Sequence, residues 1–308
     1  MDFQLVTRID NPLPSPLRRE PAVTPPLRVG ALQCAWHPDP AQHRDVLAQG
    51  VALAAGEGAR IVFLQELTLS PYFCLAPDVP DALSRYGEDL ETGPTAALAR
   101  ELATRHGIAV HASLYERTPD DRGFNTAICV DSSGQLVART RKTHIPEFAY
   151  YHEDRYFEPS EEDCTVTTVC GTRFAFPTCW DQWFPELART LSLDGAEVIV
   201  YPTAIGSEPD FPEIDTQPLW RQMIAANGLA NATFMIAVNR IGTEGPLTFY
   251  GSSFISDPYG RILVDAPREA PAVLVADLDL DQRRDWLSFG LLSTRRPDRY
   301  GRLVAPRP

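Results

Sequence analysis

The sequence predicts an α/β fold, because short apolar runs typical of buried strands alternate with stretches that have helical spacing. The composition agrees with this prediction, since 44% of the residues are hydrophobic and 22% are charged, as in ordinary globular proteins. A chain of 308 residues can bury a large core without disulfides or structural metals. No composition break or internal repeat divides residues 27–308, so we expect a single domain there.

A proline-rich segment precedes the expected domain. Residues 11–26 read NPLPSPLRREPAVTPP, and proline removes a backbone donor and disfavours both helices and central strands. We therefore expect residues 1–26 to form an extended arm or a partly disordered leader rather than a domain. The first ten residues carry acidic side chains and no apolar run, so they lack the pattern of a secretory signal.

The first half of the domain is expected to alternate strands with helices. Residues 27–34 form an apolar run typical of a buried strand, and residues 39–58 have helical spacing that stops in glycine-rich sequence. Residues 61–64 form a short apolar strand, which is followed by Gln65 and Glu66. The elements expected next are a helix at 92–107, a strand at 108–116, and a hairpin of strands 124–130 and 136–142.

The second half is expected to continue this alternation. Strand-like runs at 165–169 and 173–178 flank Gly171, which predicts a turn between two paired strands. A helix at 185–193 and a buried strand at 197–201 follow. The remaining expected elements are a helix at 216–231 and strands at 233–238, 248–256, 261–264 and 272–278.

Charge and cysteine content exclude several classes of partner. The net charge is −13, and an acidic protein repels phosphate backbones, so we expect no nucleic-acid partner. The six cysteines are scattered and form no CxxC pair, which argues against a disulfide framework and a zinc site. Free thiols are typical of a reducing compartment, so we expect a cytoplasmic protein. No apolar stretch approaches the roughly 20 residues that span a bilayer, so no membrane partner is expected.

Three residues at expected strand ends could together hydrolyse an amide. Cys179 follows the run FAFPT, with a helix expected from Pro185, and an ionised thiol is a strong nucleophile. Glu66 follows a buried run, so its carboxylate should be partly desolvated and suited to general-base work. Lys142 ends another strand, where a fixed ammonium would lower the pKa of a neighbouring thiol and stabilise an oxyanion.

Other catalytic arrangements remain open from the residues alone. His144 or His152 could pair with a cysteine as a general base. The chain has no GxSxG elbow for a serine nucleophile. A metal site is the weakest alternative, because His37 and His43 lie near each other without a third ligand at a suitable spacing.

The sequence around these three residues resembles the nitrilase, or carbon–nitrogen hydrolase, superfamily. FLQELTLSPYF surrounds Glu66, RKTHIPE surrounds Lys142, and CWDQWFPE begins at Cys179. The order Glu, Lys, Cys and the spacings of 76 and 37 residues are similar to those of the superfamily. CWDQWFPE, YPTAIGSEP and SPYF are most similar to the N-carbamoylputrescine amidohydrolase branch.

The resemblance implies a structure and a set of residue roles. It implies a four-layer αββα sandwich that pairs as a homodimer into αββα–αββα or forms a higher homo-oligomer, without a cofactor or a metal. Glu66 would be the general base, Lys142 the cation that stabilises the tetrahedral intermediate, and Cys179 the nucleophile. Glu153 would be a second glutamate near them, and the backbone N–H of Trp180 would help to hold the oxyanion. The expected pocket residues are Tyr72, Trp180, Thr203 and Ala204.

The resemblance also implies a small-molecule substrate whose terminal ureido group is cleaved to ammonia, carbon dioxide and an amine. Relatives that act on carbamoyl amino acids place arginines after the nucleophile, whereas Gln182 and Trp183 stand there in this chain. We therefore expect an amine-bearing substrate rather than one with an α-carboxylate. Residues 147–152 depart from that branch and should affect the substrate. An amide or nitrile substrate, an acyltransferase reaction, and a non-catalytic sensor or scaffold are the alternatives.

Overall fold

The computed structural model describes residues 2–305, whose strands form two large mixed sheets that confirm the α/β prediction. The first sheet consists, in spatial order, of β1 (Gln4–Arg8), β17 (Ala272–Leu278), β2 (Leu27–Gln33), β3 (Ile61–Phe63), β4 (Ala109–Arg117), β5 (Gly123–Val130) and β6 (Leu136–Arg141). The second sheet consists of β16 (Ile262–Asp265), β15 (Phe254–Ser256), β12 (Phe234–Asn239), β11 (Val198–Thr203), β10 (Thr172–Ala175) and β9 (Thr167–Val169).

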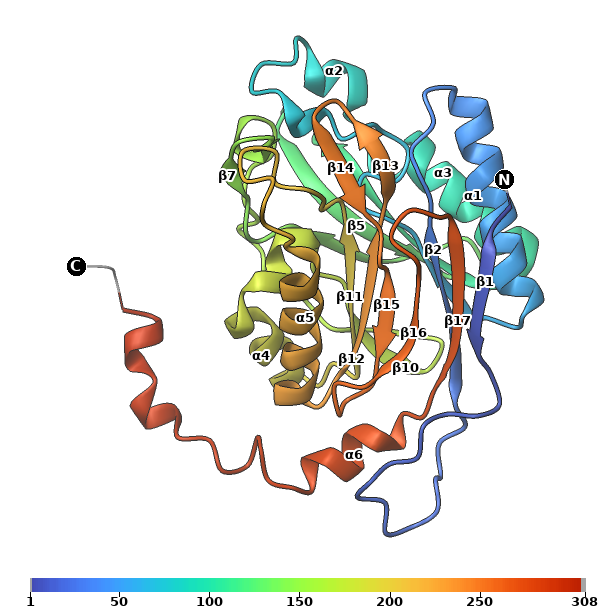
Figure 1. Cartoon of the computed structure of the whole chain (residues 1–308), viewed down its shortest axis with the longest axis vertical. Helices are drawn as coiled ribbons and strands as arrows, with labels where there is room; N and C mark the ends of the chain where they lie inside the picture. The colour runs from blue at the N-terminus through green and yellow to red at the C-terminus, as the bar shows by residue number, and fades with distance from the viewer. Residues whose placement is uncertain (1, 306–308) are drawn as a thin grey trace.

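The longer helices lie against these sheets. Figure 1 shows α1 (Pro40–Gly56) and α3 (Pro94–His106) on one side of the strands, and α4 (Pro185–Leu193) and α5 (Gln217–Asn231) on the other. Helix α1 starts where the Asp39 side chain accepts hydrogen bonds from two backbone N–H groups of the first turn. Helix α3 stops at Gly107, which adopts the left-handed conformation that glycine tolerates best.

A buried apolar core fills the space between the two sheets. Phe63 of the first sheet and Phe174 of the second have ring centroids 5.8 Å apart. Val200 and Ile236 of the second sheet and Leu274 of the first belong to the same core and have no exposed surface. Because each sheet is covered by helices on its other face, its central strands are buried on both faces and read as continuous apolar runs.

The direction of the strands brings several strand ends to one edge of the molecule. β2, β3 and β4 run parallel, and β6 has the same direction because it is separated from β4 by the antiparallel β5. In the second sheet β10, β11 and β12 are parallel to one another. The segments that follow β3, β6 and β10 carry Glu66, Lys142 and Cys179, respectively. Such carboxyl edges are where α/β proteins commonly build their sites.

The structure corrects two of the expected strands. The run 248–256 is not one strand, because β14 (Leu247–Tyr250) and β15 belong to different sheets. Gly251 and Ser252 separate them with φ angles of +52° and +57°, which redirect the chain. The run 173–178 ends as a strand at Ala175. Elements that the sequence did not predict are β1, α2 (Ala82–Tyr86), β7 (Glu147–Phe148), β8 (Tyr151–His152), β13 (Ile241–Glu244) and α6 (Asp281–Leu287).

The N-terminal residues lie against the region around α6. β1 pairs in parallel with β17 at the edge of the first sheet, as Figure 1 shows. Farther along, Arg18 forms ion pairs with Asp279 and Asp285 at 2.9 and 2.8 Å. Within residues 2–305, the structure has no helix with the length and apolar character required to cross a bilayer.

Candidate active site

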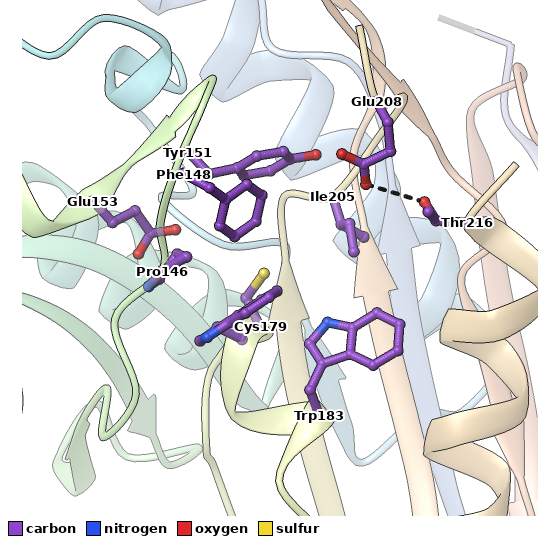
Figure 2. Close-up of a pocket in the computed structure, with 10 residues that line it drawn as sticks. Pro146, Phe148, Tyr151, Glu153, Cys179, Trp183, Ile205, Glu208 and Thr216 are labelled. Carbon is purple, nitrogen blue, oxygen red and sulfur yellow. Dashed lines mark hydrogen bonds between the residues drawn. The ribbon is translucent and has the colours of Figure 1, made fainter. Parts of the chain in front are cut away.

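A cavity of about 400 Å³ opens at the edge where the strand ends meet. We call the part formed by Cys179 and Glu153 the inner end, because both side chains are buried. We call the part formed by Glu208 and Thr216 the outer end, because both residues are only partly buried. Figure 2 shows aromatic side chains along the wall between the two ends. Four aromatic residues contribute to this wall: Phe148, Tyr151, Trp180 and Trp183.

Cys179 occupies the first position of a short 3₁₀ turn, η3 (Cys179–Trp183). The sequence placed this residue directly at a strand end before a helix, but β10 stops at Ala175 and α4 begins at Pro185. Cys179 has a φ of +42°, an uncommon backbone conformation for a side chain other than glycine. Strain of this kind is often found at functional sites, where the surrounding structure holds it in place.

The start of the 3₁₀ turn leaves two backbone N–H groups without a partner inside the turn. The first hydrogen bond of the turn runs from the N–H of Asp181 to the carbonyl of Thr178, at 3.0 Å. The N–H groups of Cys179 and Trp180 come before it, as at any helix start. The expected role of the Trp180 N–H as an oxyanion donor is therefore compatible with the geometry of the turn.

Glu66 follows β3 in a segment that buried polar groups hold in place. Arg240 donates hydrogen bonds to the carbonyls of Glu66 and Leu67, at 2.8 and 3.0 Å. The N–H of Leu67 donates to Ser113 Oγ at 3.1 Å, and Leu67 itself has a φ of +48°. These contacts fix the backbone on both sides of the Glu66 carboxylate.

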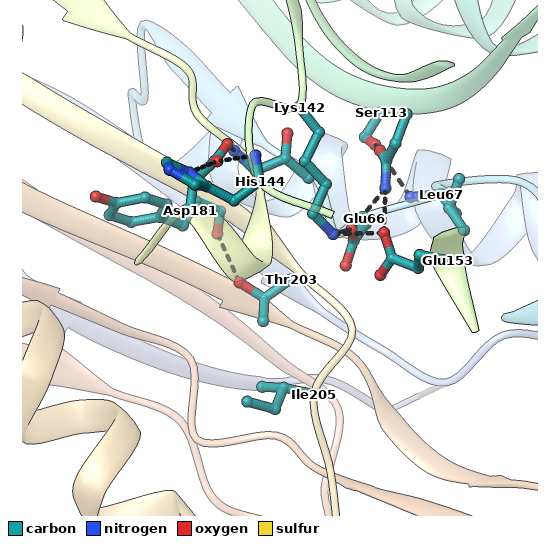
Figure 3. Close-up of polar contacts among 12 residues, drawn as sticks. Glu66, Leu67, Ser113, Lys142, His144, Glu153, Asp181, Thr203 and Ile205 are labelled. Carbon is teal, nitrogen blue, oxygen red and sulfur yellow. Dashed lines mark hydrogen bonds and ion pairs between the residues drawn. The ribbon is translucent and has the colours of Figure 1, made fainter. Parts of the chain in front are cut away.

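Three charged side chains form a buried cluster beside Cys179. Lys142 Nζ lies 2.9 Å from Glu66 Oε1 and 2.6 Å from Glu153 Oε2, as Figure 3 shows. None of the three side chains is exposed to solvent. Asn125 Nδ2 donates a further hydrogen bond to Glu66 Oε1 at 2.7 Å. Lys142 is also the only lysine in the sequence, so no other lysine could supply this ammonium.

The charges of the cluster stabilise one another. Burial by itself lowers the pKa of Lys142, but the carboxylates of Glu153 and Glu66 outweigh it and raise the pKa well above the usual value. Lys142 is therefore a permanent cation at neutral pH. Burial raises the pKa of Glu153 to about 7, with Lys142 opposing and Glu66 adding to the shift. Glu153 consequently changes its charge near neutral pH.

The thiol of Cys179 is not ionised in advance. Burial and the negative charge of Glu66 raise its pKa well above the usual value, although Lys142 lowers it as the sequence led us to expect. The backbone of Ala204 also lowers this pKa by a hydrogen bond. Attack by this sulfur would therefore require a base to remove the thiol proton. Glu66 Oε2 is buried and has no hydrogen-bond partner among residues 2–305, so it is free to accept that proton.

The expected pocket residues take different positions. Trp180 lies in the cavity wall. Tyr72 instead donates its hydroxyl to Glu153 Oε1 at 2.8 Å, behind the inner end. Thr203 is buried and donates to the carbonyl of Tyr201, and Ala204 contributes its backbone beside the Cys179 sulfur.

The histidine alternative is not supported by the position of His144. Its Nδ1 lies 2.8 Å from Asp181 Oδ1, and its ring stacks on Phe184 with centroids 3.7 Å apart. Both interactions hold the His144 ring against Asp181 and Phe184 rather than against Cys179. Glu66 is thus better placed than His144 to act as the base.

The outer end contains a carboxylate that the sequence interpretation missed. Glu208 lies in the YPTAIGSEP segment, and Thr216 donates a hydrogen bond to its Oε1 at 3.4 Å. Partial burial raises the pKa of Glu208. None of the residues that line the cavity is lysine or arginine in the part of the chain that the structure describes. The outer end therefore favours a positive group on a ligand.

Two loops meet over the cavity. The β7–β8 hairpin carries Phe148, and at its turn Tyr150 adopts a φ of +65°. Tyr150 donates its hydroxyl to Asp210, in the loop that carries Glu208, at 3.2 Å. The departures noted at residues 147–152 thus lie in the cavity wall and its cover.

Comparison with known proteins identifies the family. Residues 28–287 match the carbon–nitrogen hydrolase family. The chain is 36% identical to N-carbamoylputrescine amidase of Arabidopsis thaliana over 284 residues, which cover 88% of this chain and 93% of that enzyme. It is 33% identical to citrullinase of Francisella tularensis, over 90% and 98% of the two chains. A carbon–nitrogen hydrolase of Helicobacter pylori superposes with a TM-score of 0.84 at 28% identity, over 91% and 99% of the chains.

Proposed function

Because the chain belongs to the carbon–nitrogen hydrolase family, we propose that it hydrolyses the terminal ureido group of a small amine-bearing molecule, with Cys179 as nucleophile. One observation carries this proposal. A single cavity has the Cys179 thiol and Glu153 at its inner end and the Glu208 carboxylate at its outer end, and Glu153 belongs to the charged cluster with Lys142 and Glu66. A molecule such as N-carbamoylputrescine has a ureido group at one end and an ammonium at the other.

The first half of the reaction forms a covalent intermediate. Glu66 takes the proton of the Cys179 thiol, and the sulfur attacks the ureido carbon. Lys142 and the N–H of Trp180 stabilise the oxyanion. Glu66 returns the proton to the leaving nitrogen, so ammonia departs and the carbamoyl group stays bound to sulfur as a thioester-type intermediate.

The second half releases the product. Glu66 removes a proton from water, which attacks the same carbon, and the proton passes to sulfur as the thiol leaves. The product is a carbamic acid that decomposes to carbon dioxide and the free amine. Glu153 supports both halves, because it shares Lys142 with Glu66 and keeps the ammonium in place.

The outer end selects the substrate in this proposal. The aromatic wall suits an alkyl chain, and Glu208 pairs with the distal ammonium. The same features disfavour citrulline, because its α-carboxylate would find no cationic side chain among the described residues that line the cavity.

A substrate series tests the proposal. We expect ammonia release from N-carbamoylputrescine, and a kcat/KM about 10- to 100-fold lower for N-butylurea, which lacks the ammonium. Citrulline should be a poorer substrate than N-carbamoylputrescine. Turnover of simple aliphatic amides without turnover of N-carbamoylputrescine would refute the proposed substrate but not the proposed mechanism. A Cys179→Ser variant with full activity would refute the mechanism.

The alternative of a non-catalytic sensor has its own test. A sensor has no chemical need for a thiol, a free carboxylate oxygen and a buried ammonium in one cluster. Iodoacetamide should alkylate Cys179 faster than Cys34 and Cys74, since only Cys179 of these three lines the cavity. Equal rates at the three thiols, together with no ammonia from any ureido compound, would favour the sensor.

We also propose the larger assembly that the family resemblance implied. The two sheets share one core and have helices on their outer faces, which supports a four-layer αββα arrangement. Leu193 of α4 and Leu219 and Leu229 of α5 are exposed apolar side chains that pairing into an αββα–αββα homodimer could cover. Residues 27–308 would be the catalytic domain and residues 1–26 its arm. The six free thiols agree with a cytoplasmic location. Light scattering would test the dimer.

A further inference from the structure

Lys142 and Cys179 must be held at a fixed separation, although they come from different sheets. Lys142 follows β6 of the first sheet, and Cys179 follows β10 of the second. An oxyanion formed on a carbon bound to Cys179 must meet Lys142 within hydrogen-bond distance. A residue that contacts both segments could set this distance.

We propose that Asp181 is a positioning residue that fixes the segment after Lys142 to the turn that carries Cys179. Its side chain has no exposed surface. Asp181 Oδ2 accepts from the N–H of Thr178 at 2.9 Å, directly before Cys179. The same oxygen lies 3.4 Å from the N–H of Thr143, directly after Lys142.

The second carboxylate oxygen strengthens the attachment to the Lys142 segment. Asp181 Oδ1 accepts from the N–H of His144 at 2.9 Å and lies 2.8 Å from His144 Nδ1 (Figure 3). The stacking of the His144 ring on Phe184 fixes the ring in the orientation that this contact needs. One carboxylate thus joins two segments that belong to opposite sheets.

A carboxylate has the shape and the acceptor oxygens that these contacts need. It offers acceptor sites on both oxygens, whereas an amide of the same shape offers one oxygen and one NH₂ group. In Asp181→Asn the NH₂ group must face N–H donors on one side, either at Thr178 or at His144. The two segments would then separate slightly. A misplacement of about 1 Å can cost roughly 10²-fold in rate.

This inference rests on the proposed function, because it assumes that Lys142 and Cys179 act on the same carbon. Asp181 touches neither the reacting atoms nor the cavity in this assignment, since its contacts are to backbone groups and His144. It should therefore affect kcat rather than substrate binding. A purely structural aspartate would lower stability without this kinetic signature.

Asp257 supplies a matched control. It has no exposed side-chain surface, and it accepts backbone hydrogen bonds from Tyr259 and Arg261, both at 3.0 Å, in the turn between β15 and β16. Asp257→Asn makes the same chemical change in a buried turn outside the cavity lining. We expect Asp181→Asn to lower kcat about 10²-fold with KM changed less than about 3-fold. Asp257→Asn should change kcat less than about 2-fold.

The single lysine allows a second measurement that needs no substrate. With isotope-labelled lysine, the side chain of Lys142 gives one NMR signal in the whole protein. That signal should shift or broaden in Asp181→Asn and stay unchanged in Asp257→Asn. If the wild type released no ammonia from any ureido compound, the proposed function would fail while this signal still tested the positioning role.

Two outcomes would overturn the inference. One is an Asp181→Asn protein whose kcat and lysine signal both match those of the wild type. The other applies if Asp181→Asn does not fold, in which case His144→Phe replaces it. This variant removes the ring contact to Asp181 Oδ1, leaves the backbone N–H contact in place and keeps an aromatic ring on Phe184. We expect His144→Phe to lower kcat about 3- to 10-fold. Full activity and an unshifted lysine signal in His144→Phe would contradict the proposal.

Discussion

The two ends of the cavity are built in different ways. The inner end takes Cys179 from the segment that follows β10 of the second sheet and Glu153 from the turn after β8, while Glu66 and Lys142 behind it follow strands of the first sheet. Its charged cluster is closed to solvent. The outer end takes Glu208 from a loop, and Phe148 in the adjoining wall comes from the β7–β8 hairpin. Both residues are partly exposed. In the proposed function, chemistry and substrate choice are therefore separated along one cavity, with the chemistry at the buried inner end and the substrate choice at the partly exposed outer end.

The polar contacts behind the two ends show the same contrast. Arg240, Asn125 and Asp181 hold the inner residues through buried hydrogen bonds. At the outer end, Glu208 has one long hydrogen bond to Thr216. Substitutions at the inner end should therefore reduce turnover of every substrate, whereas substitutions at the outer end should change the preference among substrates.

The largest effect is expected for Glu66→Gln. The amide cannot accept the thiol proton, and the pKa of Cys179 is too high for the thiol to ionise by itself, so kcat should fall about 10³-fold for all substrates. Ammonia release from N-carbamoylputrescine and N-butylurea measures this loss. Glu88→Gln is the control, because Glu88 is a partly buried glutamate that pairs with Thr95 outside the cavity lining. A loss confined to one of the two substrates would contradict the separation of the two ends.

A smaller and selective effect is expected for Glu208→Gln. Loss of the negative charge should lower kcat/KM for N-carbamoylputrescine about 10- to 100-fold, because a hydrogen bond to a charged group contributes about 1.5–3 kcal/mol. The kcat/KM for N-butylurea should stay within about 2-fold, since it has no ammonium. Glu213→Gln, in the same loop but absent from the cavity wall, is the matched control. Equal losses of kcat/KM for both substrates would indicate that Glu208 takes part in the chemical step rather than in substrate selection.

The pH dependence should belong to the inner end alone. The Glu153 carboxyl is protonated below its pKa of about 7 and then offers fewer acceptor sites to Lys142 and Tyr72. We therefore expect kcat/KM to rise with pH through about 7 and then level off. Glu153→Gln should have lower activity without this rise, while Glu208→Gln should keep it. A rise that persists in Glu153→Gln would assign the titration to another group.

The smallest effect concerns stability in the core below the inner end. Both ring nitrogens of His111 are buried without a hydrogen-bond partner among residues 2–305, and burial lowers its pKa to about 3. Between about pH 6.5 and 3 the unfolded chain binds a proton that the folded chain excludes, so stability falls as the pH falls. At about 1.4 kcal/mol per pH unit, His111 should cost about 2 kcal/mol at pH 5 relative to pH 7.5.

Denaturant unfolding of His111→Leu at these two pH values tests this expectation. The variant should lose less stability on acidification than the wild type, and its kcat at pH 7.5 should change little. His106→Leu, in the last turn of α3, is the control. An unchanged pH dependence in His111→Leu would show that other groups cause the acid sensitivity.

Much of the fold could be predicted from the sequence because buried strands leave continuous apolar runs. The strands around residues 27–34, 61–64 and 108–116 and helix α1 were predicted within a few residues. The prediction of a single strand at 248–256 was wrong, because the apolar pattern continues through a change of backbone direction at Gly251. β1 was missed because it borders the proline-rich segment and pairs with a strand more than 260 residues away.

The site could be predicted only in part for a physical reason. Glu66, Lys142 and Cys179 stand in local sequence contexts that resemble a known family, so the resemblance pointed to each of them. Glu208 and Asp181 acquire their surroundings only when distant segments meet, and neither has a local pattern that separates it from a surface acid. Tyr72 was expected in the pocket wall, whereas its hydroxyl is hydrogen-bonded to Glu153.

The solitary lysine has a practical consequence for following motion at the inner end. Reagents that acylate side-chain amines have one lysine to modify in this protein, and its Nζ lies between two carboxylates with no exposed surface. Acylation of Lys142 in the folded protein therefore requires the buried cluster to open locally. The rate of label uptake, compared with that of the unfolded chain, would report the free energy of this opening directly. A ligand that closes the cavity should slow the uptake, so the rate of acylation of Lys142 would measure how often the site opens.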